Sequence, residues 1–143
     1  MNATMEKFGY PDTLIREYDH WVVLLRPQQA TLGALVLICK EDASTLSQIS
    51  IEAFSELKEI TTAVESCLRE NFKYDKINYL MLMMVDPDVH FHVLPRYADL
   101  RIFGNMEFAD PGWPGPPALN QTNDVGEEIK RQVQESLKDA FSH

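Results

Sequence analysis

An apolar stripe between residues 50 and 72 constrains the fold more than any other feature of the chain. Hydrophobic residues recur there at steps of three and four, the spacing of one face of an α-helix, at Phe54, Leu57, Ile60, Val64, Cys67 and Leu68. Ser50 is a suitable N-cap, and Glu52 and Glu56 lie where the helix dipole favours negative charge. A helix with one long apolar face must pack against a second layer of structure.

Five segments around this helix are rich in β-branched, aromatic and other apolar residues, which favours strands. They cover residues 13–18, 20–26, 32–40, 77–85 and 90–96. Residues 32–40 are apolar almost throughout, which indicates a strand covered on both faces, and we interpret the methionines of 77–85 as core filler. The first ten residues are too weakly patterned to predict an element. We therefore predict an α+β fold, with an antiparallel, mostly meander sheet of about five strands crossed by the long helix.

After the last strand the chain predicts an arm and a second helix. Residues 98–121 have no periodicity, and DPGWPGPP at 110–117 is incompatible with a helix interior or a central strand, because proline removes a donor and fixes φ. Apolar residues then recur every four positions, with Thr122 or Asn123 as the expected cap: Val125, Ile129, Val133, Leu137 and Phe141. We expect one domain over 1–143, with a core at about 13–97, an irregular arm at 98–121 and a C-terminal helix at 122–143.

Composition excludes two classes of partner. The formal net charge is −9, from 22 acidic and 13 basic residues, and there is no run rich in Lys and Arg. The negative electrostatic potential around such a chain repels nucleic-acid backbones and anionic membranes, so we expect neither as a partner. The two cysteines, Cys39 and Cys67, make no disulfide framework and are predicted to be buried free thiols. No apolar run approaches the roughly 20 residues that cross a bilayer, and no hydrophobic signal segment is evident, so we expect a cytoplasmic protein.

The segment VDPDVHFHVLPRY, residues 85–97, concentrates the residues capable of chemistry. Asp88, His90 and His92 alternate with apolar residues, so a strand here would place two imidazoles and a carboxylate on one face. The simplest interpretation is a polar strand edge without chemistry. A second is a metal site at Asp88/His90/His92, which the spacing permits without being diagnostic of it. A third is covalent catalysis, since a neutral imidazole nitrogen is a good nucleophile toward phosphorus.

At these residues the sequence resembles the histidine triad (HIT) superfamily, in which three histidines alternate with apolar residues and Pro-Arg often follows. The resemblance extends over roughly 13–97, through HWVVLLRPQQATLGALVLICK, the long helix and DKINYLML. The WPGP arm resembles the C-terminal region of some bacterial members. The resemblance implies a HIT-like fold, no cofactor or metal, and a small-molecule nucleotide as substrate.

By that resemblance, His90 would attack the α-phosphate of a nucleoside phosphoramidate or dinucleoside polyphosphate and form a nucleotidyl-histidine intermediate, and His92 would contact the phosphate and leaving group. Asn78 would help to bind phosphate. Apart from the resemblance, Trp113 is either a packing anchor of the arm or a lining residue of the ligand pocket. The resemblance also implies a homodimer, which the extra apolar residues of the long helix favour: Ile51, Ala53 and Ala63.

Three positions depart from the family pattern. Asp88 stands at the first triad position, where histidine is usual; Ala34 stands beside Gly33, where an additional histidine is frequent; and Arg26 precedes Pro27, where an acidic or amide residue commonly binds the ribose. These departures leave open a non-catalytic nucleotide-binding protein of the same fold.

Asp88 carries a further expectation. On the same strand face as His90, its carboxylate would lie about 5–7 Å from the imidazole, where its negative charge would favour the protonated ring. Alternatively, Asp88 belongs to the turn before the strand and accepts hydrogen bonds from backbone N–H groups.

Overall fold

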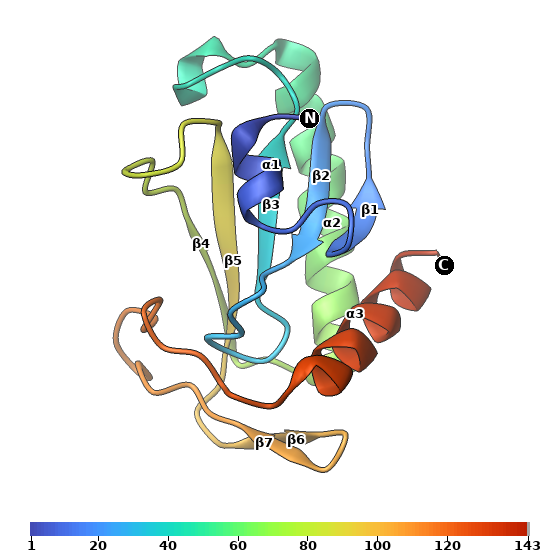
Figure 1. Cartoon of the computed structure of the whole chain (residues 1–143), viewed down its shortest axis with the longest axis vertical. Coiled ribbons are helices and arrows are strands. Elements are labelled where there is room, and N and C mark those ends of the chain that lie inside the picture. Colours follow the sequence, from blue (N-terminus) through green and yellow to red (C-terminus); the bar gives the residue numbers. More distant parts are fainter. Residues whose placement is uncertain (143) are drawn as a thin grey trace.

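The computed structural model describes residues 1–142 and contains a five-stranded antiparallel sheet with the strand order β1-β2-β3-β5-β4 (Figure 1). Its strands are β1 (Leu14–Glu17), β2 (Trp21–Leu25), β3 (Leu35–Cys39), β4 (Lys76–Leu80) and β5 (His90–Arg96). The first three strands form a meander. The chain then crosses to β4 at the edge, and β5 returns between β4 and β3. The predicted α+β class and five-stranded antiparallel sheet are confirmed.

Three α-helices and one short 3₁₀ turn accompany the sheet: α1 (Ala3–Lys7), the turn Leu46–Gln48, α2 (Ile51–Phe72) and α3 (Glu127–Phe141). The long helix has the bounds that its sequence predicts. The Ser50 hydroxyl accepts the N–H of Ala53 at the start, and Lys73 ends the helix in the left-handed conformation, with φ 53°.

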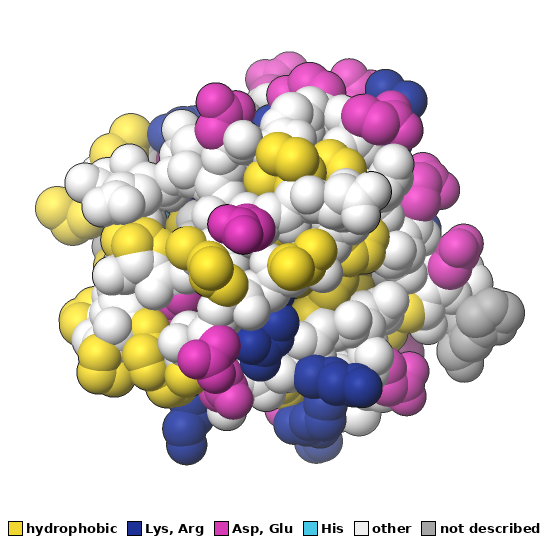
Figure 2. All heavy atoms as spheres, turned by 90° about the horizontal axis from the view of Figure 1, so that it is seen from below, with side chains coloured by type: hydrophobic (Ala, Val, Ile, Leu, Met, Phe, Trp, Pro, Cys, Tyr) yellow, Lys and Arg dark blue, Asp and Glu magenta, His cyan; other side chains and the backbone are white. Residues whose placement is uncertain are grey.

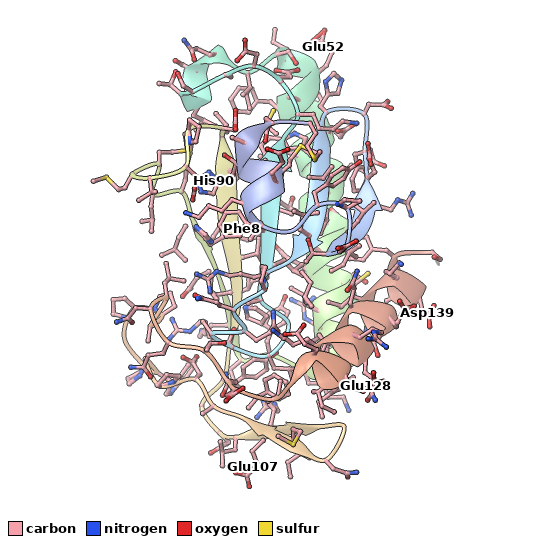
Figure 3. All side chains as sticks on the ribbon, viewed as in Figure 1. Phe8, Glu52, His90, Glu107, Glu128 and Asp139 are labelled. Atoms are coloured by element: carbon pink, nitrogen blue, oxygen red, sulfur yellow. The ribbon has the colours of Figure 1, made fainter. Side chains whose placement is uncertain are left out.

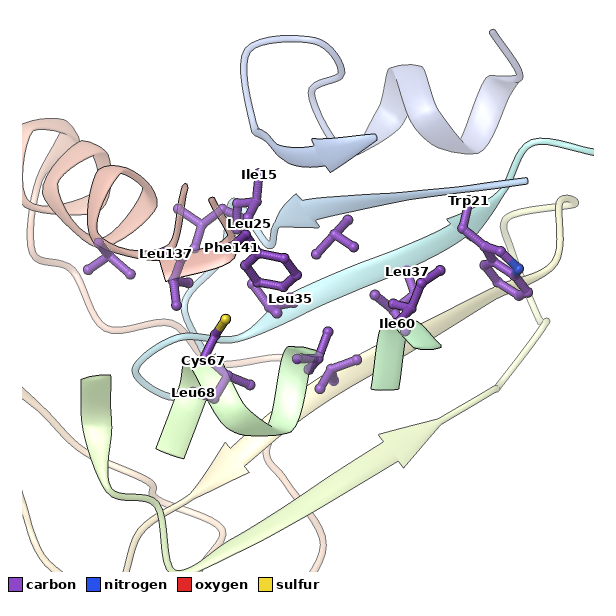
Figure 4. Packing of buried hydrophobic residues seen from close by; sticks show 14 of the residues in the cluster. Ile15, Trp21, Leu25, Leu35, Leu37, Ile60, Cys67, Leu68, Leu137 and Phe141 are labelled. Carbon is purple, nitrogen blue, oxygen red and sulfur yellow. The ribbon is translucent and has the colours of Figure 1, made fainter. Parts of the chain in front are cut away.

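The main core lies between the sheet and α2, with α3 closing one side (Figure 4). Alternate residues of β2 and β3 point into it, among them Trp21, Leu35 and Leu37, and they meet the stripe of α2. The Trp21 indole donates to the carbonyl of Ala53 at 2.9 Å, which satisfies its only polar atom inside the core. Both faces of β3 are covered, as its continuous apolarity predicts.

The opposite face of the sheet is covered by α1, an element that the sequence did not predict. Met5 and Phe8 pack on the alternate residues of β2 and β3: Val22, Leu24, Val36 and Ile38. The Asn2 side chain caps the helix by accepting the N–H of Met5. Five residues with two apolar side chains are too short to show a helical period, which is why pattern reading failed here.

The strand predicted at 77–85 ends at Leu80, and its continuation is a loop. Met83 has a positive φ of 53°, which is incompatible with a strand. Met84 is 86% exposed, so the interpretation as core filler was wrong for this methionine, whereas Met81 and Met83 are partly buried and pack against the main core. An apolar run does not by itself distinguish a buried strand from an exposed apolar loop.

The arm is more ordered than its sequence predicts. It contains a two-stranded hairpin, β6 (Arg101–Phe103) and β7 (Met106–Phe108), whose strands are too short to read from periodicity. The face that carries this hairpin shows hydrophobic side chains among acidic and basic ones, with no histidine from the described part of the chain (Figure 2). Asn123 does not cap the last helix; its amide bonds to the backbone of Gln29 and Ala109, and α3 begins after Gly126.

A buried ion pair fastens the arm to the sheet. The Arg96 guanidinium, at the end of β5, binds both carboxylate oxygens of Asp110, at 2.7 and 3.0 Å. The Asp110 side chain is fully buried, and it also accepts the backbone N–H of Tyr97 at 3.1 Å. The start of the proline-rich segment is therefore fixed against the end of the strand that carries the histidines.

Within residues 1–142 no helix has the length and apolar character needed to span a membrane. Cys39 and Cys67 are both buried free thiols, as predicted. The terminal His143 lies outside the described residues, as does the end of the helix predicted to 143.

Candidate functional site

The two histidines lie on one face of β5, the face that α1 covers (Figure 3). His90 is opposite Ile38 and His92 is opposite Val36, so both belong to an inner strand of the sheet. Their ring centroids are 5.2 Å apart with the planes nearly perpendicular, and Phe8 contacts both rings, at 6.1 and 5.7 Å between centroids. Burial on a central strand, under a helix, holds the imidazoles in fixed relative positions.

The tautomer of His90 follows from its one hydrogen bond. Its Nδ1 lies 2.7 Å from the backbone carbonyl of Asp88. A carbonyl only accepts, so Nδ1 carries the proton, and the Nε2 of a neutral His90 keeps its lone pair. This is the form that a nucleophilic imidazole needs.

His92 has the opposite tautomer. The Nε of Arg26 donates to its Nδ1 at 3.4 Å, and a guanidinium has no acceptor, so the proton of a neutral His92 lies on Nε2. Burial, followed by the positive charges of Arg26 and His90, lowers the pKa of His92 to about 4. His92 is therefore a neutral hydrogen-bond donor at neutral pH.

This pKa predicts how stability depends on pH. Between pH 6.5 and about 4 the unfolded chain binds a proton that folded His92 does not, so the free energy of unfolding falls as pH falls through this interval. We expect His92 to account for a loss of about 2–3 kcal/mol between pH 7 and pH 4.5. Urea unfolding at several pH values should show a flatter pH dependence for His92→Gln than for the wild type. His20→Gln, at a partly exposed histidine, is the matched control, and equal slopes in His92→Gln and wild type would contradict the prediction.

The imidazoles open into a cavity of about 490 Å³, which is ample for a small molecule. Phe8, Leu82 and Leu119 give it apolar walls. Its two cationic side chains are Lys7, whose Nζ is 2.8 Å from Asp86, and Arg26. Asp86 lines the same cavity and pairs with Lys7, so among the described residues Arg26 is the lining cation without an anionic partner, and its charge beside the histidine pair favours an anion in a chain of net charge −9.

The side chain of Asp88 is hydrogen-bonded to α1. One carboxylate oxygen accepts the backbone N–H and the hydroxyl of Thr4, at 3.1 and 2.9 Å. Asp88 lies before β5 begins, so the strand alternation that predicted a shared face with His90 does not apply to it. Only its backbone carbonyl contacts the imidazole.

We expect Asp88→Asn to lower the free energy of unfolding by about 1–3 kcal/mol, because a charged acceptor of two hydrogen bonds is lost, and to leave the acidic limb of the pH–rate profile in place. Thr4→Val is the matched variant, since it removes one of the donors. The cost of the double variant should be less than the sum of the single costs, because both residues make the same contact. A shift of the acidic limb in Asp88→Asn would show instead that this carboxylate acts on His90.

Asn78 and Trp113 are not brought to the histidines. Asn78 lies two residues along β4 from Leu80, the partner of His92, and its side-chain oxygen accepts from Arg96 at 2.7 Å. Trp113 lines a different hollow of about 470 Å³, together with Asn78 and Arg96. Asn78 and Trp113 thus lie near each other, at the opposite end of β5 from the catalytic candidates.

A metal centre is not formed by the side chains in residues 1–142. No three His, Cys, Asp or Glu side chains are grouped there as ligands would be. Of the set Asp88/His90/His92, the carboxylate is bound to Thr4, and the Nδ1 atoms of both histidines are already hydrogen-bonded.

Apart from His90 and His92, no residue of the cavity wall was predicted as a site residue. The wall consists of Lys7 and Phe8 at the end of α1, residues 26–28 after β2, the loop 82–86 after β4, and Leu119 of the arm. The sequence contained one signal, the arginine before Pro27 at a position where the resemblance led us to expect a ribose-binding residue. The others reach the cavity only through tertiary packing, which no local pattern encodes.

A five-stranded antiparallel sheet with a histidine pair on an inner strand, opening into a cavity, defines a class of small α+β proteins. A family model described as the HIT domain matches residues 7–99, and the chain belongs to this family. No curated protein sequence matches the chain significantly.

Solved structures of similar fold include three histidine triad proteins. That of Marinobacter aquaeolei has 21% identity and a TM-score of 0.77, and the match covers 99% of this chain and 95% of that one. The protein of Bradyrhizobium japonicum has 18% identity and a TM-score of 0.76, with coverage of 99% and 96%. A hypothetical histidine triad nucleotide-binding protein of Sulfolobus tokodaii has 15% identity, a TM-score of 0.68 and coverage of 91% and 83%. At these identities the likeness is one of fold.

Proposed function

We propose that this protein is a nucleotide hydrolase or nucleotidyl transferase that acts at the α-phosphate through a nucleotidyl intermediate on His90. The observation that carries the proposal is the pair of complementary tautomers. His90 presents a free Nε2 and His92 presents an Nε2–H to one cavity of about 490 Å³. One nitrogen is suited to attack phosphorus and the other to stabilise the charge that develops on the phosphoryl oxygens.

In the first step the lone pair of His90 Nε2 forms a bond to phosphorus, and the bond from phosphorus to the leaving group breaks with its electrons on the leaving group. The imidazole becomes cationic, and its Nδ1–H bond to the Asp88 carbonyl strengthens. His92 donates its Nε2–H to a phosphoryl oxygen or to the leaving atom. Because the pKa of His92 is about 4, it carries no spare proton, so a phosphate departs as an anion without one, whereas the amine of a phosphoramidate takes its proton from solvent as the bond breaks.

In the second step water, or another acceptor hydroxyl, attacks the same phosphorus. The bond from phosphorus to His90 breaks, its electrons return to Nε2, and the proton of the attacking water passes to solvent. The imidazole is regenerated in its starting tautomer, held by the same carbonyl of Asp88. Two displacements at one phosphorus replace one difficult step by two easier ones.

The test is a turnover assay of the wild-type protein with adenosine phosphoramidate, diadenosine polyphosphates and nucleotide sugars, in which released mononucleotide is measured by chromatography. Turnover that depends on His90 would support the proposal. If none of these compounds is turned over, the alternative of a non-catalytic nucleotide-binding protein replaces it, and calorimetric titration with mononucleotides tests that alternative. The similar fold of the hypothetical histidine triad nucleotide-binding protein of Sulfolobus tokodaii supports a nucleotide ligand in either case.

A small-molecule nucleotide fits the charge distribution better than a nucleic acid does. The chain as a whole repels polyanions with its net charge of −9, whereas Arg26 supplies positive charge inside the cavity. We propose the cytoplasm as the place of action, because the two free thiols favour a reducing compartment.

We also propose that the protein forms a homodimer. The edge strand β4 has pairing partners on one side only, and the loop after it exposes Leu82, Met84 and Val85. The long helix supports the proposal less than its sequence indicated, since Ala53 is fully buried against the sheet and only Ile51 is largely exposed.

Sedimentation velocity at micromolar concentration should give about twice the chain mass of 16.4 kDa. The variant Met84→Lys with Val85→Lys should shift the protein toward the monomer, because two charges would be buried at the interface. Ile102→Lys, at an exposed apolar residue of the hairpin, is the control. A wild-type protein that sediments as a monomer would contradict the proposal.

A further inference from the structure

Arg26 is a buried cation without a buried counterion. Its residue is 7% exposed, and its guanidinium makes three contacts, all to uncharged acceptors. These are the Nδ1 of His92 at 3.4 Å, the carbonyl of Gln28 at 2.8 Å and the carbonyl of Leu119 at 3.3 Å. Among residues 1–142 no carboxylate forms a salt bridge with it, although the chain has 22 acidic residues.

Such an arrangement is costly unless a ligand supplies the negative charge. A guanidinium removed from water loses its solvation, and neutral carbonyls replace only part of it. Arg96 is a buried arginine of the same protein with a structural role, and its guanidinium binds both oxygens of the buried Asp110 carboxylate. Arg26 instead lines the cavity that contains His90 and His92. Its planar guanidinium can donate two parallel hydrogen bonds to a phosphate or a carboxylate.

The position of Arg26 relative to the two histidines indicates which part of the substrate carries the negative charge that pairs with this arginine. Its backbone N–H bonds to Ala34, which lies two residues along β3 from Val36, the partner of His92. From His90 the cavity therefore passes His92, whose ring centroid is 5.2 Å away, before it reaches Arg26. A phosphate at Arg26 therefore lies beyond the His92 ring from a phosphorus at His90, past both the 5.2 Å between the two ring centroids and the 3.4 Å contact of Arg26 with His92. Neighbouring phosphates of a polyphosphate share one oxygen and lie closer together, whereas phosphates on different positions of a ribose are held apart by the sugar.

We propose that Arg26 makes the cavity specific for nucleotides that carry a second phosphate on the sugar, apart from the one that His90 attacks. This inference rests on the proposed function and names the substrate class of the same site. Arg26 then has two roles: its Nε keeps His92 in the donor tautomer, and its Nη groups bind the second phosphate.

The test is calorimetric titration of the wild-type chain and of Arg26→Gln with AMP, ADP, adenosine 2′,5′-bisphosphate and adenosine 3′,5′-bisphosphate. One of the two bisphosphates should bind the wild type about 10- to 100-fold more tightly than AMP, the range expected for a charge-assisted hydrogen bond. In Arg26→Gln the ratio should fall to about twofold or less. The ratio compares two ligands on one protein, so a general weakening of the site does not change it.

Two further variants complete the design. Arg131→Gln removes an arginine from the exposed surface of α3 and should keep the wild-type ratio. Arg26→Lys retains the charge without the fork and should give an intermediate ratio. If Arg26→Gln does not fold, as judged by thermal unfolding, the wild-type ratio and Arg26→Lys decide the question.

Equal affinities of the wild type for AMP and both bisphosphates, or an unchanged ratio in Arg26→Gln, would overturn the inference and leave the proposed function in place. Tighter binding of ADP than of either bisphosphate would place the second phosphate on a polyphosphate chain and would also overturn it. Absence of both nucleotide binding and turnover would overturn the proposed function as well.

Discussion

His90→Ala should release no mononucleotide from any substrate that the wild-type protein turns over. His90 Nε2 is the one imidazole nitrogen of the described cavity with a free lone pair, because the Nδ1 of His92 accepts from Arg26 and its Nε2 carries the proton. Without a nucleophile neither displacement takes place. In wild-type protein quenched in alkali during turnover, where a phosphorus–nitrogen bond survives, mass spectrometry should find one nucleotidyl group on the peptide that contains His90.

The controls separate loss of the nucleophile from loss of a histidine. His20→Ala, outside the cavity and hydrogen-bonded to Glu41, should keep wild-type turnover. His92→Ala should retain the nucleophile but lose the donor to the phosphoryl oxygens, which lowers turnover by about 10²- to 10⁴-fold. Full activity of His90→Ala would refute the mechanism, and a nucleotidyl group on any other residue would reassign the nucleophile.

The parts of the fold that the sequence predicted are those in which one physical period extends over many residues. The α2 stripe repeats through six turns, and β3 is apolar along its whole length, so both could be read with little ambiguity. The five residues of α1 and the three-residue strands of the hairpin are shorter than any window in which a period is visible. Their conformation depends on contacts far along the chain, such as that of Thr4 with Asp88.

The candidate site divides in the same way. His90 and His92 were predicted because they share one strand, and period two places them on one face. Of the two positions considered for Asp88, the structure has the one before the strand, where its carboxylate accepts the backbone N–H of Thr4. Asn78 and Trp113 lie near Arg96, which no local pattern indicated. The roles of Lys7 and Arg26 could not be predicted, since α1 and the end of β2 reach the cavity only in the folded sheet.

Arg96→Gln should be the most destabilising of the charge substitutions, with a loss of about 3–5 kcal/mol in the free energy of unfolding. It leaves the fully buried carboxylate of Asp110 without its partner and with a single remaining hydrogen bond, from the N–H of Tyr97. Urea unfolding at pH 7 measures the loss. Arg101→Gln is the matched control, because Arg101 pairs with Asp75 at 3.5 Å on the surface, and a pair of that kind contributes at most about 1 kcal/mol.

The cause of the loss can be isolated by removing both charges. In Arg96→Met with Asp110→Leu no charge is left buried, and apolar side chains of similar size fill the space, so the double variant should be more stable than Arg96→Gln. The arm would then be held by the hydrogen bonds of Asn123, by that of Arg26 to Leu119, and by packing. Since Leu119 of the same arm accepts from Arg26, turnover should fall in both variants, and by less in the double variant. If the double variant is as unstable as the sum of its single substitutions, the two residues contribute independently, and the arm is held by something other than this ion pair.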